Sequence, residues 1–193
     1  EILEILFYLK KKLKKKTIFI IEASSYQLDY SKIFKSKFAV ILNLSPDHIE
    51  RHKTIDKYVK AKFKLLKNQK KGFLAFVKKD DKLILKELRS NKFNSKIIRV
   101  NTKLNSKFLK KIDNAYFKTE TNEENLSFIL EISKKFNIKK ALLIKIIQKF
   151  RGLKYRQQII FKNKYLIIIN DSKSTSFSSS IGILKANSNF FFF

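Results

Sequence analysis

Residues 38–48 read FAVILNLSPDH, and this stretch decides the fold. Its first five residues form a continuous apolar run of strand length, which is typical of a strand buried on both faces of a parallel sheet. The polar residues from Asn43 to His48 would follow at the carboxyl end of that strand. Ligands bind at this edge of open parallel sheets, so a functional site is expected there.

The chain on both sides of this stretch alternates between strand and helix patterns. Apolar runs predict further strands at 17–21, 72–77 and 96–100, and helical periodicity predicts helices at 1–16, 24–34, 55–68, 80–88, 121–136 and 139–150. Thr121 and Glu124 have the spacing of a capping box at the start of the helix at 121–136. Strands that alternate with helices favour an α/β fold with a mainly parallel sheet flanked by helices. Residues 102–118 fit neither pattern.

The periodicity changes after Gly152. Residues 158–161 and 165–169 are typical of a β-hairpin that turns at 162–164, although the usual two-residue turn signal is missing. We therefore expect one domain over 1–150 and the start of a second α/β domain over 151–193. A chain that opens with Glu1 and closes with four phenylalanines is expected to be a fragment.

Composition narrows the classes of function. Hydrophobic residues make up 44% of the 193, which is enough for a sizeable core and excludes wholesale disorder. The chain has no cysteine, which excludes a disulfide scaffold, a zinc finger and thiol catalysis. No apolar run approaches the roughly 18 residues of a membrane span, and no signal peptide is visible. We expect a cytoplasmic protein without a membrane partner.

The charge of the chain is extreme. Lysine and arginine number 44 against 16 acidic residues, which gives a formal net charge of +28. One interpretation is a basic nucleic-acid-binding module, which would cluster its lysines on one surface with exposed aromatic side chains between them. The other is a bias toward AT-rich codons, in which the lysines are solvated faces. No known nucleic-acid motif is present, so we expect no specific nucleic-acid partner.

Two side chains stand at the carboxyl ends of the expected strands. Glu22 directly follows the run at 17–21, and His48 closes the polar segment after the run at 38–42. A carboxylate and an imidazole at neighbouring strand ends can hold a divalent metal ion. Alternatively, Glu22 caps the next helix and His48 pairs with a neighbouring acid.

Lys62 interrupts the apolar stripe of the helix expected at 55–68. At about 100° per residue, the apolar side chains fill one arc and the other lysines fall opposite, whereas Lys62 falls within the arc. A lysine there must extend its amine to solvent, pair with another group, or lose its charge. A neutral, nucleophilic amine is the functional interpretation.

Five blocks of sequence, in order along the chain, resemble one family of enzymes. They are residues 22–29 (EASSYQLD), 42–52 (LNLSPDHIERH), 58–62 (YVKAK), 150–156 (FRGLKYR) and 170–175 (NDSKST). Together they are similar to the central domain of the Mur ligases and to the entry into their C-terminal domain. Within the family, they look most like the enzymes that add D-glutamate to UDP-N-acetylmuramoyl-L-alanine.

The resemblance implies roles for particular side chains. Glu22 and His48 match magnesium ligands, and Lys62 matches a lysine carried as a carbamate that helps to hold a second magnesium ion; His48 and Lys62 would serve catalysis. The matches to nucleotide-binding residues are Asn122, Asn125, Arg156 and Asp171. Ser24, Lys173 and Thr175 match substrate-binding and hinge segments, and His52 is a further motif member. Asn122 and Asn125 also fit ordinary helix-start chemistry.

The implied reaction is amide ligation in peptidoglycan synthesis, which serves cell-wall growth, cell shape and division. ATP would phosphorylate the muramoyl-alanine carboxylate, and the amine of D-glutamate would then displace phosphate, with Mg²⁺ neutralising charge. The implied cofactors are ATP and Mg²⁺, and the implied protein is a cytoplasmic monomer. Another Mur ligase or a relative of folyl-polyglutamate synthase is the alternative within the superfamily.

The chain departs from the family pattern in two places. The family's phosphate-binding loop, G-x-x-G-K-T/S, is absent and is expected upstream of residue 1. Tyr155 stands where the family usually has histidine. We therefore expect the 193-residue chain alone to be catalytically inactive.

Overall fold

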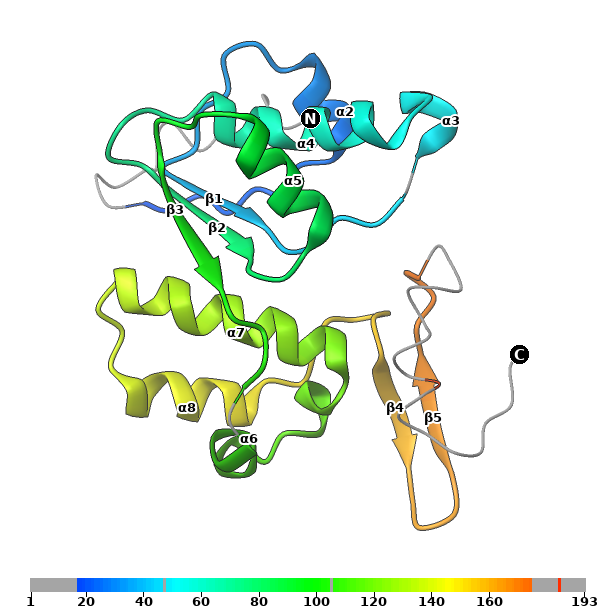
Figure 1. The fold of residues 1–193 in the computed structure, drawn as a ribbon. Helices are drawn as coiled ribbons and strands as arrows, with labels where there is room; N and C mark the ends of the chain where they lie inside the picture. Colours follow the sequence, from blue (N-terminus) through cyan, green and yellow to red (C-terminus); the bar gives the residue numbers. More distant parts are fainter. Residues whose placement is uncertain (1–16, 47, 105, 175–183, 185–193) are drawn as a thin grey trace.

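A computed structural model describes residues 17–46, 48–104, 106–174 and 184 (Figure 1). The helix expected at 1–16 and the predicted site residue Thr175 lie outside the described residues, as does the run of phenylalanines at 190–193.

Three parallel strands form the main sheet. They are β1 (Phe38–Ile41), β2 (Leu74–Lys78) and β3 (Lys96–Val100), in that spatial order. Phe76 in the middle of β2 pairs with Val40 of β1 and with Ile98 of β3. The sequence predicts all three strands, and it predicts β3 with the same bounds. The expected α/β fold with a parallel sheet is confirmed.

Helices cover both faces of this sheet (Figure 1). On one side lie α2 (Ser25–Tyr30), α3 (Ile49–His52), α4 (Ile55–Lys67) and α5 (Lys82–Ser90). On the other side lie α7 (Glu120–Lys135) and, beyond it, α6 (Ser106–Ile112), the 3-10 helix η1 (Ala115–Lys118) and α8 (Lys140–Lys149). The sequence predicts all of these except the short α3, α6 and η1. No helix in the described part of the chain is both long and apolar enough to cross a membrane.

Successive side chains of each strand pack into different helical layers. Ala39 and Ala75 lie in a cluster with side chains of α4 and α5. Val40 and Phe76 pack on the opposite face, against Phe128 of α7. The two-residue period of a strand sends neighbouring side chains to opposite faces, and here both faces are covered. This double burial is why the strands are continuous apolar runs rather than alternating patterns.

A separate two-stranded sheet follows the helices. Its strands β4 (Gln158–Lys162) and β5 (Ile167–Asn170) are antiparallel, as the sequence predicts. The side-chain oxygen of Asn163 accepts hydrogen bonds from the backbone N–H groups of Tyr165 and Leu166, at 2.8 and 2.7 Å. This asparagine turn replaces the missing two-residue signal, since asparagine can imitate a backbone turn.

The strand expected at 17–21 is wrong. These residues belong to neither sheet, and their side chains are exposed, to 96% at Ile20. An apolar run becomes a buried strand only where a neighbouring strand and helices cover it. The run itself carries no information about that cover.

The capping box expected from Thr121 to Glu124 is also wrong. Helix α7 begins at Glu120, so Thr121 lies inside its first turn. The Glu124 carboxylate forms an ion pair with Lys78 at the end of β2 instead. The Glu124 side chain that would have completed the capping box is therefore used in a tertiary contact with Lys78.

Candidate functional site

The loops after β1 and β2 are tied together by Asp81. One of its carboxylate oxygens accepts the Ile84 N–H at 3.0 Å and so caps α5, a common role for aspartate. The other accepts the Leu44 N–H at 2.9 Å, 37 residues away in sequence. The segment that follows β1 is therefore fixed at its start, four residues before His48.

His48 begins α3 in a left-handed conformation, with φ of 53°. Its ring lies 4.9 Å from the ring of Tyr26 in α2, measured between centroids. Its Nδ1 lies 3.9 Å from a carboxylate oxygen of Glu50. This proximity supports the alternative that His48 pairs with a neighbouring acid, and its expected metal contact stays a prediction.

His52, at the end of α3, is the buried histidine of the pair, with 6% of its surface exposed. Its Nε2 lies 2.9 Å from Oγ of Ser25. Its ring stacks on Tyr26 with an angle of 9° between the planes, and it meets Tyr58 of α4 edge-on. The sequence motif includes His52, but only the fold reveals these contacts.

Lys62 lies one helical turn beyond Tyr58 on α4, and its side chain is half-buried. Its Nζ lies 5.3 Å from the centre of the Tyr58 ring, which is the distance of a cation–π contact. Of the three outcomes expected for a lysine within the apolar stripe, the contact with Tyr58 supports pairing with another group. A carbamate on Lys62 would carry no positive charge, so its formation would replace this cation–π contact.

Tyr26, His48, His52, Tyr58 and Lys62 form what we call the histidine–tyrosine cluster. The sequence of contacts runs from His48 through Tyr26, His52 and Tyr58 to Lys62. It joins α2, α3 and α4 beyond the carboxyl end of β1. His48 and Lys62, two of the residues that the sequence assigns to metal binding, therefore lie at the two ends of this series of contacts.

Glu22 lies in the segment that precedes α2, and Ser24 is the last residue of that segment. Ser24 caps that helix: its Oγ accepts the Gln27 N–H at 3.2 Å, and the Gln27 side chain accepts the Ser24 N–H at 2.9 Å. The alternative that Glu22 caps this helix is therefore wrong. Glu22 is exposed, two residues before the cap.

The packing of α2 on α4 includes an ion pair beside this cluster. Lys64 Nζ lies 2.6 Å from a carboxylate oxygen of Asp29 and donates to the Asp29 carbonyl oxygen at the same distance. The hydrogen bond from Lys64 lowers the pKa of the Asp29 carboxyl below its ordinary value of 3.8. The ion pair thus contributes stability above that pH, which is lost as the pH falls through the lowered value.

Two of the three predicted metal ligands supply the oxygen donors that magnesium prefers, while His48 supplies a nitrogen. The Glu22 carboxylate and the oxygens of a carbamate on Lys62 are hard donors of the kind that Mg²⁺ prefers. Glu22 is exposed and the His48 side chain is 40% exposed, so both can be reached from solvent. Over residues 17–46, 48–104 and 106–174, no three histidine, cysteine, aspartate or glutamate side chains cluster closely enough to hold a metal ion.

A second group of predicted residues meets where α7 faces the start of the hairpin. Asn122 is buried and donates both amide hydrogens, to the Tyr116 carbonyl at 2.8 Å and to the Gln157 side chain at 2.9 Å. Asp171 accepts the Gln157 N–H at 3.0 Å. We call this group, with Arg156, the Tyr116 junction. Asn125 lies half-buried on α7, one turn further on.

The charges at the junction act on Tyr116. Burial raises the pKa of its hydroxyl, Arg156 lowers it and Asp171 raises it, with burial the largest of the three effects. Arg156 itself is exposed, while Lys173 donates its backbone N–H to the Tyr155 carbonyl at 3.0 Å. Asn122, Arg156 and Asp171, three of the four residues that the sequence assigns to the nucleotide, therefore gather here. Arg156 and Asp171 lie 34 and 49 positions beyond Asn122 in the sequence.

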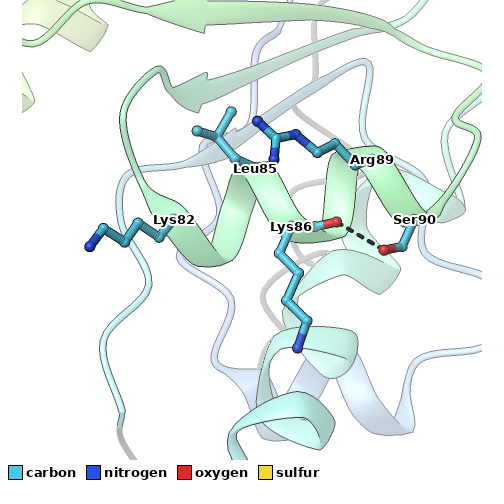
Figure 2. Close-up of a pocket in the computed structure, with 5 residues that line it drawn as sticks. All are labelled: Lys82, Leu85, Lys86, Arg89 and Ser90. Carbon is cyan, nitrogen blue, oxygen red and sulfur yellow. Dashed lines mark hydrogen bonds between the residues drawn. The ribbon is translucent and has the colours of Figure 1, made fainter.

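Two hollows in the described part of the chain are lined by neither His48 nor Lys62. One of about 360 Å³ is formed by α5 alone and is lined by Lys82, Leu85, Lys86, Arg89 and Ser90. Figure 2 shows the three cationic side chains pointing in different directions, so they do not converge on one ligand. Lys86 already pairs with Asp56 at 3.0 Å. The second hollow, of about 270 Å³, lies beside η1 and includes Asn114, Phe117 and Glu123.

A parallel sheet covered by helices, with polar side chains gathered beyond a strand end, defines an α/β domain whose expected ligand site lies at that edge. The chain belongs to the Mur ligase family, because the family described as the Mur ligase middle domain matches residues 1–146. This match confirms the resemblance and the fold class that the sequence motifs indicate.

Several curated relatives share one name. The UDP-N-acetylmuramoylalanine--D-glutamate ligase of Leptospira borgpetersenii serovar Hardjo-bovis is 32% identical over 181 residues, which cover 86% of this chain and 39% of the relative. The enzyme of that name from Pseudothermotoga lettingae is 29% identical over 175 residues, 86% of this chain and 39% of the relative. That of Buchnera aphidicola subsp. Baizongia pistaciae is 32% identical over 176 residues. The chain spans about two fifths of the length of these relatives.

Proposed function

We propose that this chain is the central part of a ligase that joins D-glutamate to UDP-N-acetylmuramoyl-L-alanine with ATP, a step in peptidoglycan synthesis. The observation that carries the proposal is the histidine–tyrosine cluster. It connects His48 and Lys62, two residues that the motifs assign to metal binding, at the strand end where α/β domains bind ligands. The names of the curated relatives support the choice of substrates.

The proposed reaction forms one amide bond. The terminal phosphoryl group of ATP passes to the carboxylate of UDP-N-acetylmuramoyl-L-alanine, which gives an acyl phosphate and ADP. The amine of D-glutamate attacks the acyl carbon, phosphate leaves with the bonding electron pair, and the amine loses a proton. Mg²⁺, when bound, would neutralise the charge of the transferring phosphoryl group.

In this proposal the chain's own residues bind and orient. Glu22, His48 and a carbamate on Lys62 hold Mg²⁺, and Asn122, Asn125, Arg156 and Asp171 contact the nucleotide. Ser24, Lys173 and Thr175 belong to the substrate-binding and hinge segments. The gathering of Asn122, Arg156 and Asp171 at the Tyr116 junction supports a shared role.

We also propose that residues 1–150 and 151–193 belong to two domains of a cytoplasmic, monomeric enzyme. The hairpin supports this division, because β4 and β5 form a sheet of their own. Apolar side chains of the hairpin, such as Ile160 and Leu166, are more than half exposed, which suits a sheet that packs against further structure.

The test uses the protein translated from the whole reading frame that contains this chain. ADP release is measured with UDP-N-acetylmuramoyl-L-alanine and D-glutamate, for the unaltered protein, Lys62→Ala and the matched control Lys60→Ala on the exposed side of α4. We expect Lys62→Ala to lower kcat on the order of 100-fold or more, as loss of a charged transition-state contact does, and Lys60→Ala to leave it unchanged.

The same protein also separates the alternatives. Incubation with ¹³C-bicarbonate is expected to produce a carbamate signal that Lys62→Ala abolishes. Activity that requires a folate and L-glutamate instead would replace the proposal with the folyl-polyglutamate alternative. Full activity of Lys62→Ala would refute the assigned role. The 193-residue chain alone is expected to release no ADP.

A further inference from the structure

His52 lies at the centre of the histidine–tyrosine cluster and has no assigned role. Only 6% of its surface is exposed, which makes it a buried polar side chain. Buried polar groups need a partner, and the imidazole has one in Ser25 Oγ, at 2.9 Å and 27 residues away. The ring is therefore fixed in position and orientation rather than merely enclosed.

The fixed imidazole touches both tyrosines of the cluster. It stacks on Tyr26 at 5.6 Å between centroids and meets Tyr58 edge-on at the same distance, with 66° between the planes. Stacked and edge-to-face arrangements are the geometries that aromatic rings prefer. Tyr58 is only 3% exposed, so its ring has little room to adopt another position while His52 is present.

The Tyr58 ring in turn lies under the amine of Lys62, 5.3 Å from Nζ. A side chain that fixes this ring therefore helps to hold the amine in its place. On the other side, the Tyr26 ring contacts His48 at 4.9 Å. One buried side chain thus stands between His48 and Lys62, two of the three residues to which the proposed function assigns the metal.

We propose that His52 is a positioning residue, which fixes the Tyr58 ring and thereby holds the Lys62 amine in its resting place. The inference rests on the proposed function only for the purpose of Lys62, since the contacts themselves do not depend on it. His52 does not touch substrate or metal in this account. It acts through Tyr58.

The test measures how fast the Lys62 amine reacts. The protein translated from the whole reading frame is trace-labelled with acetic anhydride in buffer freed of carbon dioxide, and labelling of Lys62 is read by mass spectrometry relative to exposed Lys60 on the same helix. The amine must leave the face of the Tyr58 ring to attack the reagent, so the extent of labelling reports how firmly this contact holds it. His52→Ala should raise the Lys62 to Lys60 ratio about two- to fivefold, the range that a partly exposed cation–π contact represents.

Two further variants keep the test decisive. Ser25→Ala removes the partner of the imidazole with little change in volume, and it should raise the ratio in the same direction. Tyr58→Leu removes the ring and sets the upper limit. A ratio that rises in Tyr58→Leu but not in His52→Ala or Ser25→Ala would overturn the inference. So would an equal rise at Lys60 and Lys62, which indicates general loosening of α4.

The outcome is independent of carbamate chemistry, because no bicarbonate is present. A protein that forms no ¹³C-carbamate on Lys62 would remove the proposed role of that lysine and leave the positioning by His52 intact. An unchanged labelling ratio in a protein that does form the carbamate would remove only the role of His52.

Discussion

Gly152 shows how one residue shapes the Tyr116 junction. Its φ of +82° is in the left-handed region, and a Cβ at this position would lie 2.6 Å from the Tyr116 ring. Only glycine avoids both the backbone strain and the collision. Tyr155 and Gln157 follow with positive φ values of 65° and 47°. The segment that leads into the hairpin is thus tightly wound, and Tyr116 packs directly on its glycine.

We expect Gly152→Ala to lower the free energy of unfolding by roughly 2 to 4 kcal/mol, because strain and collision add. Gly72→Ala is the matched control: its φ is +87°, but nothing lies within 4 Å of the added Cβ. That variant should cost only about 1 kcal/mol. Urea denaturation measures both. Equal losses in the two variants would show that Tyr116 moves aside without cost.

Between elements, Asp81 connects the loop after β1 to the start of α5. The Leu44 and Ile84 N–H groups both depend on its carboxylate. Asp81→Ala leaves two donors without their acceptor and should destabilise the protein by about 1 to 3 kcal/mol. Hydrogen exchange at the Leu44 amide should quicken in the same variant. The exposed neighbour serves as control, and Asp80→Ala should stay within about 0.5 kcal/mol.

This connection matters for the site because His48 lies four residues beyond Leu44. If the Leu44 amide keeps its protection in Asp81→Ala, water or another acceptor has replaced the carboxylate. The loop would then be held by the Tyr26 contact at its far end rather than by Asp81.

At the scale of the whole molecule, the net charge of +28 predicts non-specific binding to nucleic acid. Binding to duplex DNA should be measurable at low salt and should vanish near physiological salt, because it depends on released counterions. We expect a triple Lys→Glu or Arg→Glu change at Lys82, Lys86 and Arg89 to weaken it no more than the same change at exposed Lys110, Lys111 and Lys118. A gel-shift titration across salt concentrations measures both.

The alternative of a nucleic-acid-binding module makes the opposite demand. Binding that persists at physiological salt, and that the α5 triple variant alone abolishes, would identify the hollow of Figure 2 as a nucleic-acid interface. The side chains of that hollow point in different directions, which favours the interpretation that the lysines are solvated faces without a specific binding site.

The sequence by itself determines the local elements and the family. β1, β2 and β3 are recognisable as apolar runs, and the periodicity of α4 reveals its buried face. Both patterns are local, because each involves only residues that are close together in the sequence. The motifs likewise predict the Mur ligase family, which the match over residues 1–146 confirms. Which residues touch is a different matter.

Only the tertiary structure decides those contacts. The run at 17–21 is as apolar as β1, yet it is exposed, and Glu124 leaves its expected cap for Lys78. The bonds of His52 to Ser25 and of Leu44 to Asp81 join residues 27 and 37 positions apart. No local period encodes such distances, since they depend on how α2, α3, α4 and α5 pack on one sheet. The sequence predicts candidate site residues, and packing decides which of them meet.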